Sequence, residues 1–125
     1  MNTIRFFILL IVTAYTTTAA GDSLVGRAPS GAAEKRNPFE GNEYAQRAGA
    51  KLYAHHCASC HGQNRESGKK APPLIQLEVQ KVSSGKVFWV LRNGSLHRGM
   101  PSFAHLPEAQ RWQIVTYLQN TASRH

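Results

Sequence analysis

The chain has 125 residues, 42% of them hydrophobic, and carries a formal net charge of +8. This length suggests one domain at most. The charge alone would suit a nucleic-acid binder, but neither a recognition motif nor a run of basic residues accompanies it, so we expect no nucleic-acid partner. We interpret the positive charge as the source of a long-range attraction toward an acidic partner protein.

Residues 1–20 are typical of a cleavable signal peptide. Arg5 supplies the positive start, the stretch FFILLIVTAY at 6–15 is apolar, and cleavage is expected after Ala20. A retained membrane anchor is the alternative, but this stretch is well short of the roughly 20 residues needed to span a bilayer. The sequence therefore predicts export to the periplasm and no stable membrane insertion.

The next segment, residues 21–40, is rich in Gly, Ala, Ser and Pro and shows no apolar period. Such a composition is typical of a flexible leader or tether. The ordered domain would then cover residues 41–125. A hydrophobic core of about 85 residues is marginal by itself, which indicates that something else fills the core.

Three later segments carry apolar residues at helical spacing: residues 41–61, 83–93 and 106–120. No strand-like alternation competes with them. The connecting pieces 62–73 and 94–106 contain Gly and Pro at intervals and are expected to be irregular loops. The pattern predicts a small all-α domain with three main helices.

The stretch CASCH contains Cys57 and Cys60, the only two cysteines, with His61 directly after them. Three chemistries use such a stretch: a redox dithiol, part of a zinc site, or a covalent haem anchor. A redox dithiol normally lies in a strand–helix unit, and this chain offers no strands. A structural zinc ion needs four ligands, and a second ligand pair at metal spacing is absent.

The haem anchor accounts for all three residues. Thiols at positions i and i+3 of a helical turn project to the same side, so both reach the two vinyl groups along one porphyrin edge. His61 would then carry its imidazole to the iron. We therefore predict one covalently bound haem c, attached at Cys57 and Cys60, with His61 as an iron ligand.

Met100 is the candidate for the opposite face of the iron. It lies in the loop HRGMPSF, where Gly99 allows close approach of the backbone and Pro101 restrains it. A methionine that fills a gap in the core is the structural alternative. His97 and His105 are competitors for the same coordination position. We favour Met100 as the second metal ligand.

These motifs resemble class I cytochromes c, in the small monohaem group of exported bacterial members. The resemblance covers residues 41–122 and rests on an ordered set of motifs: GAKLYAHHCASCHG, PPL, NG, GMPSF and QRWQIVTYL. It implies that the first and last helices cross at Gly49 and Tyr53 against Tyr117. It also implies that a proline after the anchor, Pro72 or Pro73, supports the haem ligand; we place Pro73 in the site.

The resemblance further implies that Trp89 and Arg98 contact the haem propionates, although a core aromatic and a solvated arginine are the structural alternatives. With both iron positions occupied, we predict a one-electron carrier rather than an enzyme. The alternative is a dedicated cytochrome subunit of an exported dehydrogenase, of the quinoprotein or sulfite-oxidising type. A haem sensor or peroxidase would require that Met100 be displaced from the iron.

Overall fold

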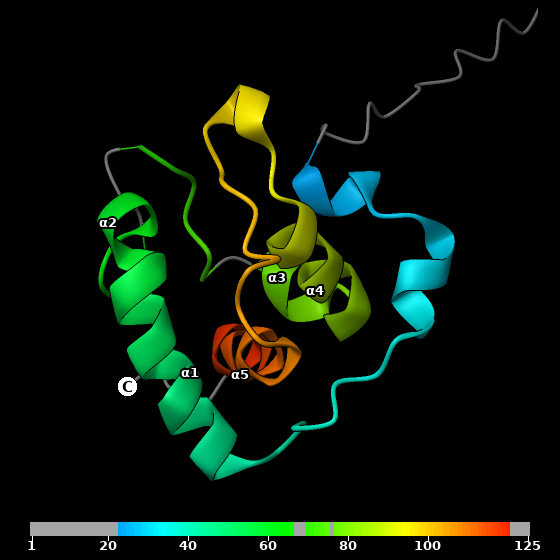
Figure 1. Ribbon diagram of the computed structural model, residues 1–125, viewed down its shortest axis with the longest axis vertical. Coiled ribbons are helices and arrows are strands. Elements are labelled where there is room, and N and C mark those ends of the chain that lie inside the picture. The colour runs from blue at the N-terminus through cyan, green and yellow to red at the C-terminus, as the bar shows by residue number, and fades with distance from the viewer. Residues whose placement is uncertain (1–22, 67–69, 76, 121–125) are drawn as a thin grey trace, which may run out of the picture.

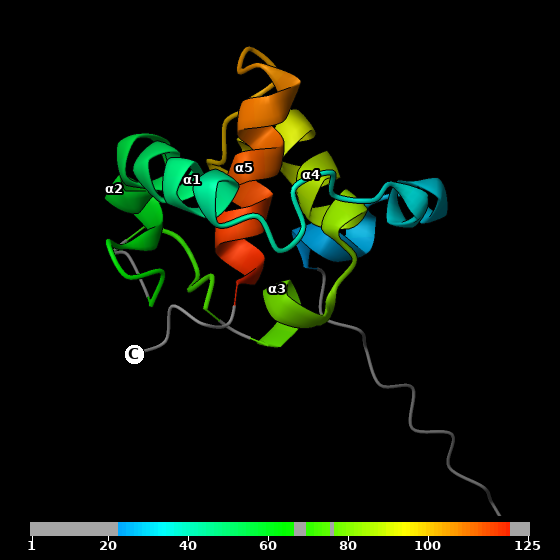
Figure 2. The same cartoon turned by 90° about the horizontal axis from the view of Figure 1, so that it is seen from below.

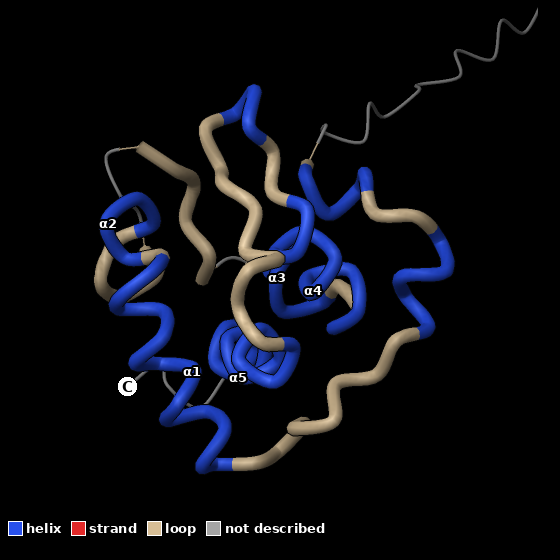
Figure 3. Tube along the Cα trace, in the orientation of Figure 1, coloured by secondary structure: helices blue, strands red, loops and turns tan. Residues whose placement is uncertain are grey.

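The computed structural model of the protein describes residues 23–66, 70–75 and 77–120, and the expected signal peptide lies outside them. Over these residues every regular element is helical (Figure 3). The 3₁₀ helices η1–η3 and the α-helices α1–α5 follow in the order η1 Leu24–Arg27, η2 Ser30–Glu34, α1 Glu43–His56, α2 Ala58–His61, α3 Leu77–Lys81, α4 Ser84–Asn93, η3 Leu96–Arg98 and α5 Glu108–Gln119. The predicted all-α fold is confirmed, with α1, α4 and α5 as the three main helices.

Helix α1 begins where the sequence offers an N-cap. The Asn42 side chain accepts a hydrogen bond from the backbone N–H of Ala45 at 3.0 Å, which satisfies one of the donors that a helix start leaves open. Glu43 adds a negative charge in the first turn, where the helix dipole favours it.

Helix α1 lies across α5, as Figure 2 shows. The contact is close because Gly49 has no side chain: a Cβ atom there would lie 2.0 Å from the backbone oxygen of Gln113. The Tyr53 and Tyr117 rings, one from each helix, pack with their centroids 5.3 Å apart. Small and aromatic residues therefore set the crossing, as the resemblance implied.

The predicted helix over residues 41–61 is interrupted at Cys57. Its φ of −121° and ψ of −33° leave the helical region, although its backbone N–H still bonds to Tyr53 O at 2.8 Å. The carbonyl of Cys57 then accepts from both Cys60 N and His61 N. A new short helix, α2, therefore starts at the first cysteine and turns the chain in a different direction.

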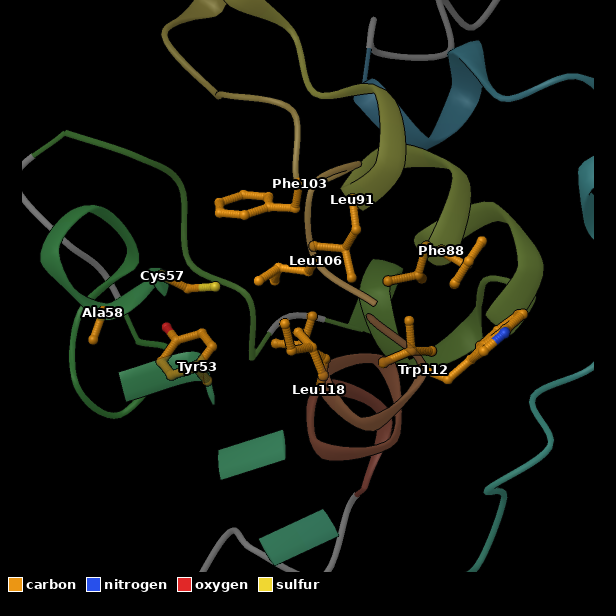
Figure 4. Close-up of a cluster of buried hydrophobic side chains, with 12 residues drawn as sticks. Tyr53, Cys57, Ala58, Phe88, Leu91, Phe103, Leu106, Trp112 and Leu118 are labelled. Carbon is orange, nitrogen blue, oxygen red and sulfur yellow. The ribbon is translucent and has the colours of Figure 1, made fainter. Parts of the chain in front are cut away.

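The core lies between α4, α5 and the end of α1. Phe88 on α4 stacks on Trp112 of α5, with ring centroids 4.0 Å apart and the planes 19° from parallel. Ile114 and Val115 of α5 are completely buried. The buried cluster continues to the C-terminal end of α1 at Tyr53 and Cys57 (Figure 4).

The N-terminal segment differs from the flexible leader that the composition indicates for residues 21–40. Within its described part, η1 and η2 contact α4, and Figure 1 shows η1 in blue beside that helix. Ala28 and Ala32 are buried. Their small side chains allow the segment to lie flat on α4, a contact that periodicity in the sequence does not reveal.

The short helix α3 adds to the three main helices that the sequence predicts. Among the described residues, no helix combines the length and the apolar character needed to cross a bilayer.

Candidate functional site

Both cysteines of the CASCH stretch are free thiols rather than a disulfide. Cys57 is 7% exposed and belongs to the buried cluster, whereas Cys60 is half-buried. In Figure 4 the Cys57 sulfur points toward Leu106. Burial, with Cys60 as the second cause, raises the pKa of the Cys57 thiol to about 11. The Cys57 sulfur is therefore a neutral thiol at neutral pH, and it belongs to an apolar cluster.

His61 is held by the backbone of the loop that follows it. Its Nδ1 lies 2.8 Å from the carbonyl oxygen of Pro72. Because a carbonyl only accepts hydrogen bonds, Nδ1 carries the proton and Nε2 keeps its lone pair. A hydrogen bond that fixes the tautomer in this way is what orients metal-binding imidazoles in general.

The proline that accepts the hydrogen bond from His61 is Pro72. The sequence favours the neighbouring Pro73 for the site, and Pro73 is half-buried next to this hydrogen bond. The two residues could not be told apart from the sequence, because the interaction uses a backbone oxygen that every residue has.

Two buried side chains contact described residues on either side of the loop between His61 and Pro72. The hydroxyl of Tyr53 donates to the carbonyl of Gly62 at 2.7 Å. Burial is the main cause that raises the pKa of Tyr53, followed by Cys57 and Tyr117, so this hydroxyl keeps its proton and remains a donor.

The second side chain is that of Arg65, one of the basic residues behind the net charge of the chain. It is 3% exposed, and its guanidinium donates to Tyr117 O at 3.0 Å while it lies 4.6 Å from the Tyr117 ring centroid. Its own carbonyl accepts from Leu74 N and Ile75 N. Arg65 therefore ties both ends of the Pro72 loop to the end of α5. No motif in the sequence signals this role.

Met100 lies on a segment that returns along the end of α4. Ser95 and Met100 form an antiparallel bridge, with Ser95 N to Met100 O at 2.8 Å and Met100 N to Ser95 O at 3.0 Å. Phe103 N bonds to Leu91 O of α4 at 2.9 Å. Met100 is half-buried and packs against the same cluster that contains Cys57 and Phe103. The structure thus brings the cysteine stretch and the methionine segment together on one apolar cluster.

The competing histidines are less enclosed. His97 and His105 are both exposed. His56 packs against His55 with ring centroids 4.6 Å apart, and burial, then His55 and His105, lowers its pKa. Among the described residues, no group of three or more His, Cys, Asp or Glu side chains could hold a metal ion.

Trp89 and Arg98 were expected near the propionates of a haem. Trp89 is half-buried on α4 and Arg98 is exposed on η3. Their contact with propionates stays a prediction.

The described residues fit a covalently bound porphyrin. Two unpaired thiols could form thioether bonds, His61 offers a nitrogen of fixed orientation, and Met100 offers a sulfur on a segment held by the Ser95 bridge. Cys57 belongs to an apolar cluster whose other side chains come from α1, α4, α5 and the Met100 segment (Figure 4). Such a donor set, with imidazole and thioether, matches the ligands that haem iron takes in electron carriers.

Comparison with known proteins supports this interpretation. A family model described as cytochrome C oxidase, cbb3-type, subunit III matches residues 45–118. The chain is 32% identical over 95 residues to cytochrome c550 of Pseudomonas aeruginosa, an alignment that covers 68% of this chain and 61% of that protein. It is 42% identical over 73 residues to the quinohemoprotein alcohol dehydrogenase ADH-IIG of Pseudomonas putida, covering 57% of this chain and 10% of that protein.

Among solved structures, the protein is similar to cytochrome CL from the marine methylotrophic bacterium Methylophaga aminisulfidivorans. The TM-score is 0.57 at 22% identity, and the match covers 67% of this chain and 59% of that chain. At this identity the likeness shows the fold. The chain spans about three fifths of the length of cytochrome c550 and a tenth of the length of the dehydrogenase.

Proposed function

Because the chain belongs to the cytochrome c family, we propose that it carries single electrons between exported redox proteins through one haem bound covalently at Cys57 and Cys60. Family membership supports electron transfer in general. The attachment residues, the single haem and the shuttle role are our proposal. Bound haem supplies an iron that alternates between two oxidation states.

The observation that carries the proposal is the hydrogen bond from His61 Nδ1 to Pro72 O. It leaves Nε2 of His61 as the only ring nitrogen with a free lone pair, directly after the second of two free cysteines. With Met100 as the opposite ligand, the iron would have no open position for oxygen or peroxide. This arrangement favours electron transfer over oxygen chemistry, because both oxidation states keep the same ligands.

The protein residues also bias the oxidation state. A thioether ligand and an apolar surrounding both favour the less charged ferrous form, which raises the reduction potential. Phe103 and Leu106, which are buried beside Cys57, exclude water from that side of the site.

Intact mass and a reduced-minus-oxidised spectrum of the purified exported protein test the proposal together. We expect a mass increase of one haem that survives denaturation, and a ferric far-red band that reports sulfur on iron. The Met100→Ala variant should keep the covalent haem, lose this band and bind carbon monoxide in the reduced form. A colourless protein of unmodified mass would overturn the proposal.

A second form of the function follows from the match to the quinohemoprotein alcohol dehydrogenase, of which this chain resembles a segment. In that form the protein accepts electrons from an exported quinoprotein-type dehydrogenase and stays bound to it. Co-purification from the native source at fixed stoichiometry would support this permanent association. A protein that elutes alone, yet is reduced by the dehydrogenase on mixing, would support the diffusing shuttle.

A further inference from the structure

Residues 23–34, which we call the N-terminal clasp, lie on α4 although the family pattern does not include them. Ala28 and Ala32 are buried against the helix. The contact depends on Gly85, because a Cβ atom there would lie 1.9 Å from the carbonyl oxygen of Ala32. At this distance the clasp and α4 are in direct backbone contact, so the position of the clasp is well defined.

The docked clasp brings Arg27 to the segment that carries Met100. Arg27 Nη1 lies 3.1 Å from Nε2 of His97 on η3. A guanidinium only donates hydrogen bonds, so Nε2 of His97 is the acceptor and Nδ1 carries the proton. The two residues are 70 positions apart in the sequence, and the contact is therefore a tertiary link.

His97 is also hydrogen-bonded to Ser95. Its Nδ1 lies 3.2 Å from Ser95 Oγ and, as the protonated nitrogen, is the donor. Ser95 is buried and pairs through its backbone with Met100 in both directions, at 2.8 and 3.0 Å. A continuous series of hydrogen bonds thus runs from the clasp to the backbone of Met100.

We propose that the N-terminal clasp holds the Met100 segment closed, with Arg27 as a positioning residue that acts through His97 and Ser95. This inference rests on the proposed function, because it takes Met100 as an iron ligand. Opening of the segment would remove the sulfur from the iron and expose a coordination position. The clasp therefore favours the electron-transfer form over a form that binds small ligands.

Exogenous imidazole is the probe for this opening in the ferric holoprotein. Imidazole reaches the iron only when Met100 leaves, so its apparent affinity scales with the open fraction of the segment. Loss of one hydrogen bond of ordinary strength predicts a rise of roughly two- to tenfold in that affinity for Arg27→Ala. The matched control is Arg36→Ala, which removes an exposed arginine just beyond the clasp and should leave the affinity unchanged.

A double-mutant cycle tests the path through His97. If Arg27 acts through His97, the Arg27→Ala/His97→Ala double variant changes imidazole affinity no more than His97→Ala alone, because both changes break one series of contacts. His97→Gln should restore part of the wild-type behaviour, since its amide can accept from Arg27 and donate to Ser95. Additive effects of the two alanine substitutions would overturn the proposed path.

The outcomes separate this inference from the proposed function. A wild-type holoprotein without the sulfur band would overturn the proposed function and the clasp with it. A wild-type holoprotein with the band, in which Arg27→Ala binds imidazole no more tightly than Arg36→Ala, would overturn the clasp alone. Because Arg27→Ala also removes a contact of the folded state, thermal unfolding of both arginine variants is measured alongside. The imidazole affinities are then compared at a temperature at which both variants are fully folded.

Discussion

At the scale of single residues, Arg65 shows how a buried cation can organise the loop next to a cofactor site. It donates to carbonyls at the end of α5, with Tyr117 O at 3.0 Å and Leu118 O at 3.4 Å. These carbonyls belong to the last turn, where a helix leaves acceptors without partners. The backbone carbonyl of the same residue accepts hydrogen bonds from Leu74 N and Ile75 N, so one residue links both elements through its side chain and its backbone.

We expect Arg65→Met to lower the free energy of unfolding by about 1.5–3 kcal/mol, the range for hydrogen bonds to charged groups. The reason is that Tyr117 O loses the donor that Arg65 supplies, whereas Leu118 O keeps its hydrogen bond from Gln80 Nε2 at 2.7 Å. Urea unfolding of the holoprotein measures the change. Arg47→Met is the control, since Arg47 is exposed and its ion pair with Glu43 spans 3.7 Å; it should cost less than about 1 kcal/mol. Equal losses would contradict the role of Arg65.

Tyr53 gives a pH-dependent prediction at the same scale. Burial raises its pKa in the folded protein above the ordinary value of about 10. The folded state therefore binds more protons than the unfolded state above pH 10, and stability falls as the pH rises, with a slope of up to about 1.4 kcal/mol per pH unit. Tyr53→Phe removes this titrating group, so the variant should lose less stability than the wild type as the pH rises above about 10.

Chemical unfolding at pH 9, 10 and 11 measures this slope. Tyr44→Phe is the matched control, because Tyr44 is 79% exposed. It should follow the wild type at every pH. If the stability of Tyr53→Phe fell as steeply with pH as that of Tyr44→Phe, the pKa of Tyr53 would not be raised in the folded protein.

The residues of the proposed site stand out in the sequence where chemistry restricts the residue type. Two thiols at fixed spacing followed by an imidazole, and one remaining methionine, are such restricted choices. The contacts of Pro72 and Ser95 use backbone atoms, which carry no signature. The burial of Arg65 has no signature in the sequence either, because it depends on partners that are distant along the chain.

At the scale of elements, the crossing of α1 and α5 depends on the absence of a side chain at Gly49. Gly49→Ala would place a Cβ atom 2.0 Å from Gln113 O and 2.9 Å from Tyr117 Cβ. The helices must separate, and overpacking of this kind typically costs about 1–3 kcal/mol.

Thermal unfolding of the holoprotein tests this expectation against Gly31→Ala. Gly31 is exposed, and a Cβ atom there meets nothing within 4 Å. The control should therefore be neutral, because it adds a methyl group in open space. A Gly49→Ala protein as stable as the control would mean that the helices adjust without cost.

The elements themselves were predictable to different degrees. Apolar residues recur at helical spacing in α1, α4 and α5, and these three helices were expected. The interruption at Cys57 was not, because the apolar pattern continues through it. The clasp was missed for another reason: Ala28 and Ala32 are too small to mark a buried face, and their burial follows from the equally small Gly85 on α4.

At the scale of the whole molecule, the haem would supply much of the apolar material that surrounds Cys57. We expect the Cys57→Ala/Cys60→Ala variant, which cannot attach haem, to be largely unfolded, because a domain of this size has a marginal core without it. Far-UV circular dichroism measures the helix content. The noncovalent addition of haem to this variant should recover part of the signal, and native helix content without haem would refute the expectation.

Net charge gives the last prediction. Removal of the expected signal peptide takes away Arg5 and lowers the charge from +8 to +7, so the molecule stays basic and should attract an acidic partner. We expect the rate of electron transfer to fall as the salt concentration rises. The reason is that the electrostatic screening length decreases from about 30 Å at 0.01 M to about 10 Å at 0.1 M salt. Stopped-flow reduction by the native partner over this range measures the dependence.

Two charge reversals locate the attraction. Arg98→Glu changes the charge on η3, two residues before Met100, whereas Arg47→Glu makes the same change of charge on α1. If the partner docks beside Met100, Arg98→Glu slows electron transfer more than Arg47→Glu at low salt, because the local charge steers the encounter. Equal slowing would mean that only the net charge attracts the partner, and the docking site would then lie elsewhere on the surface.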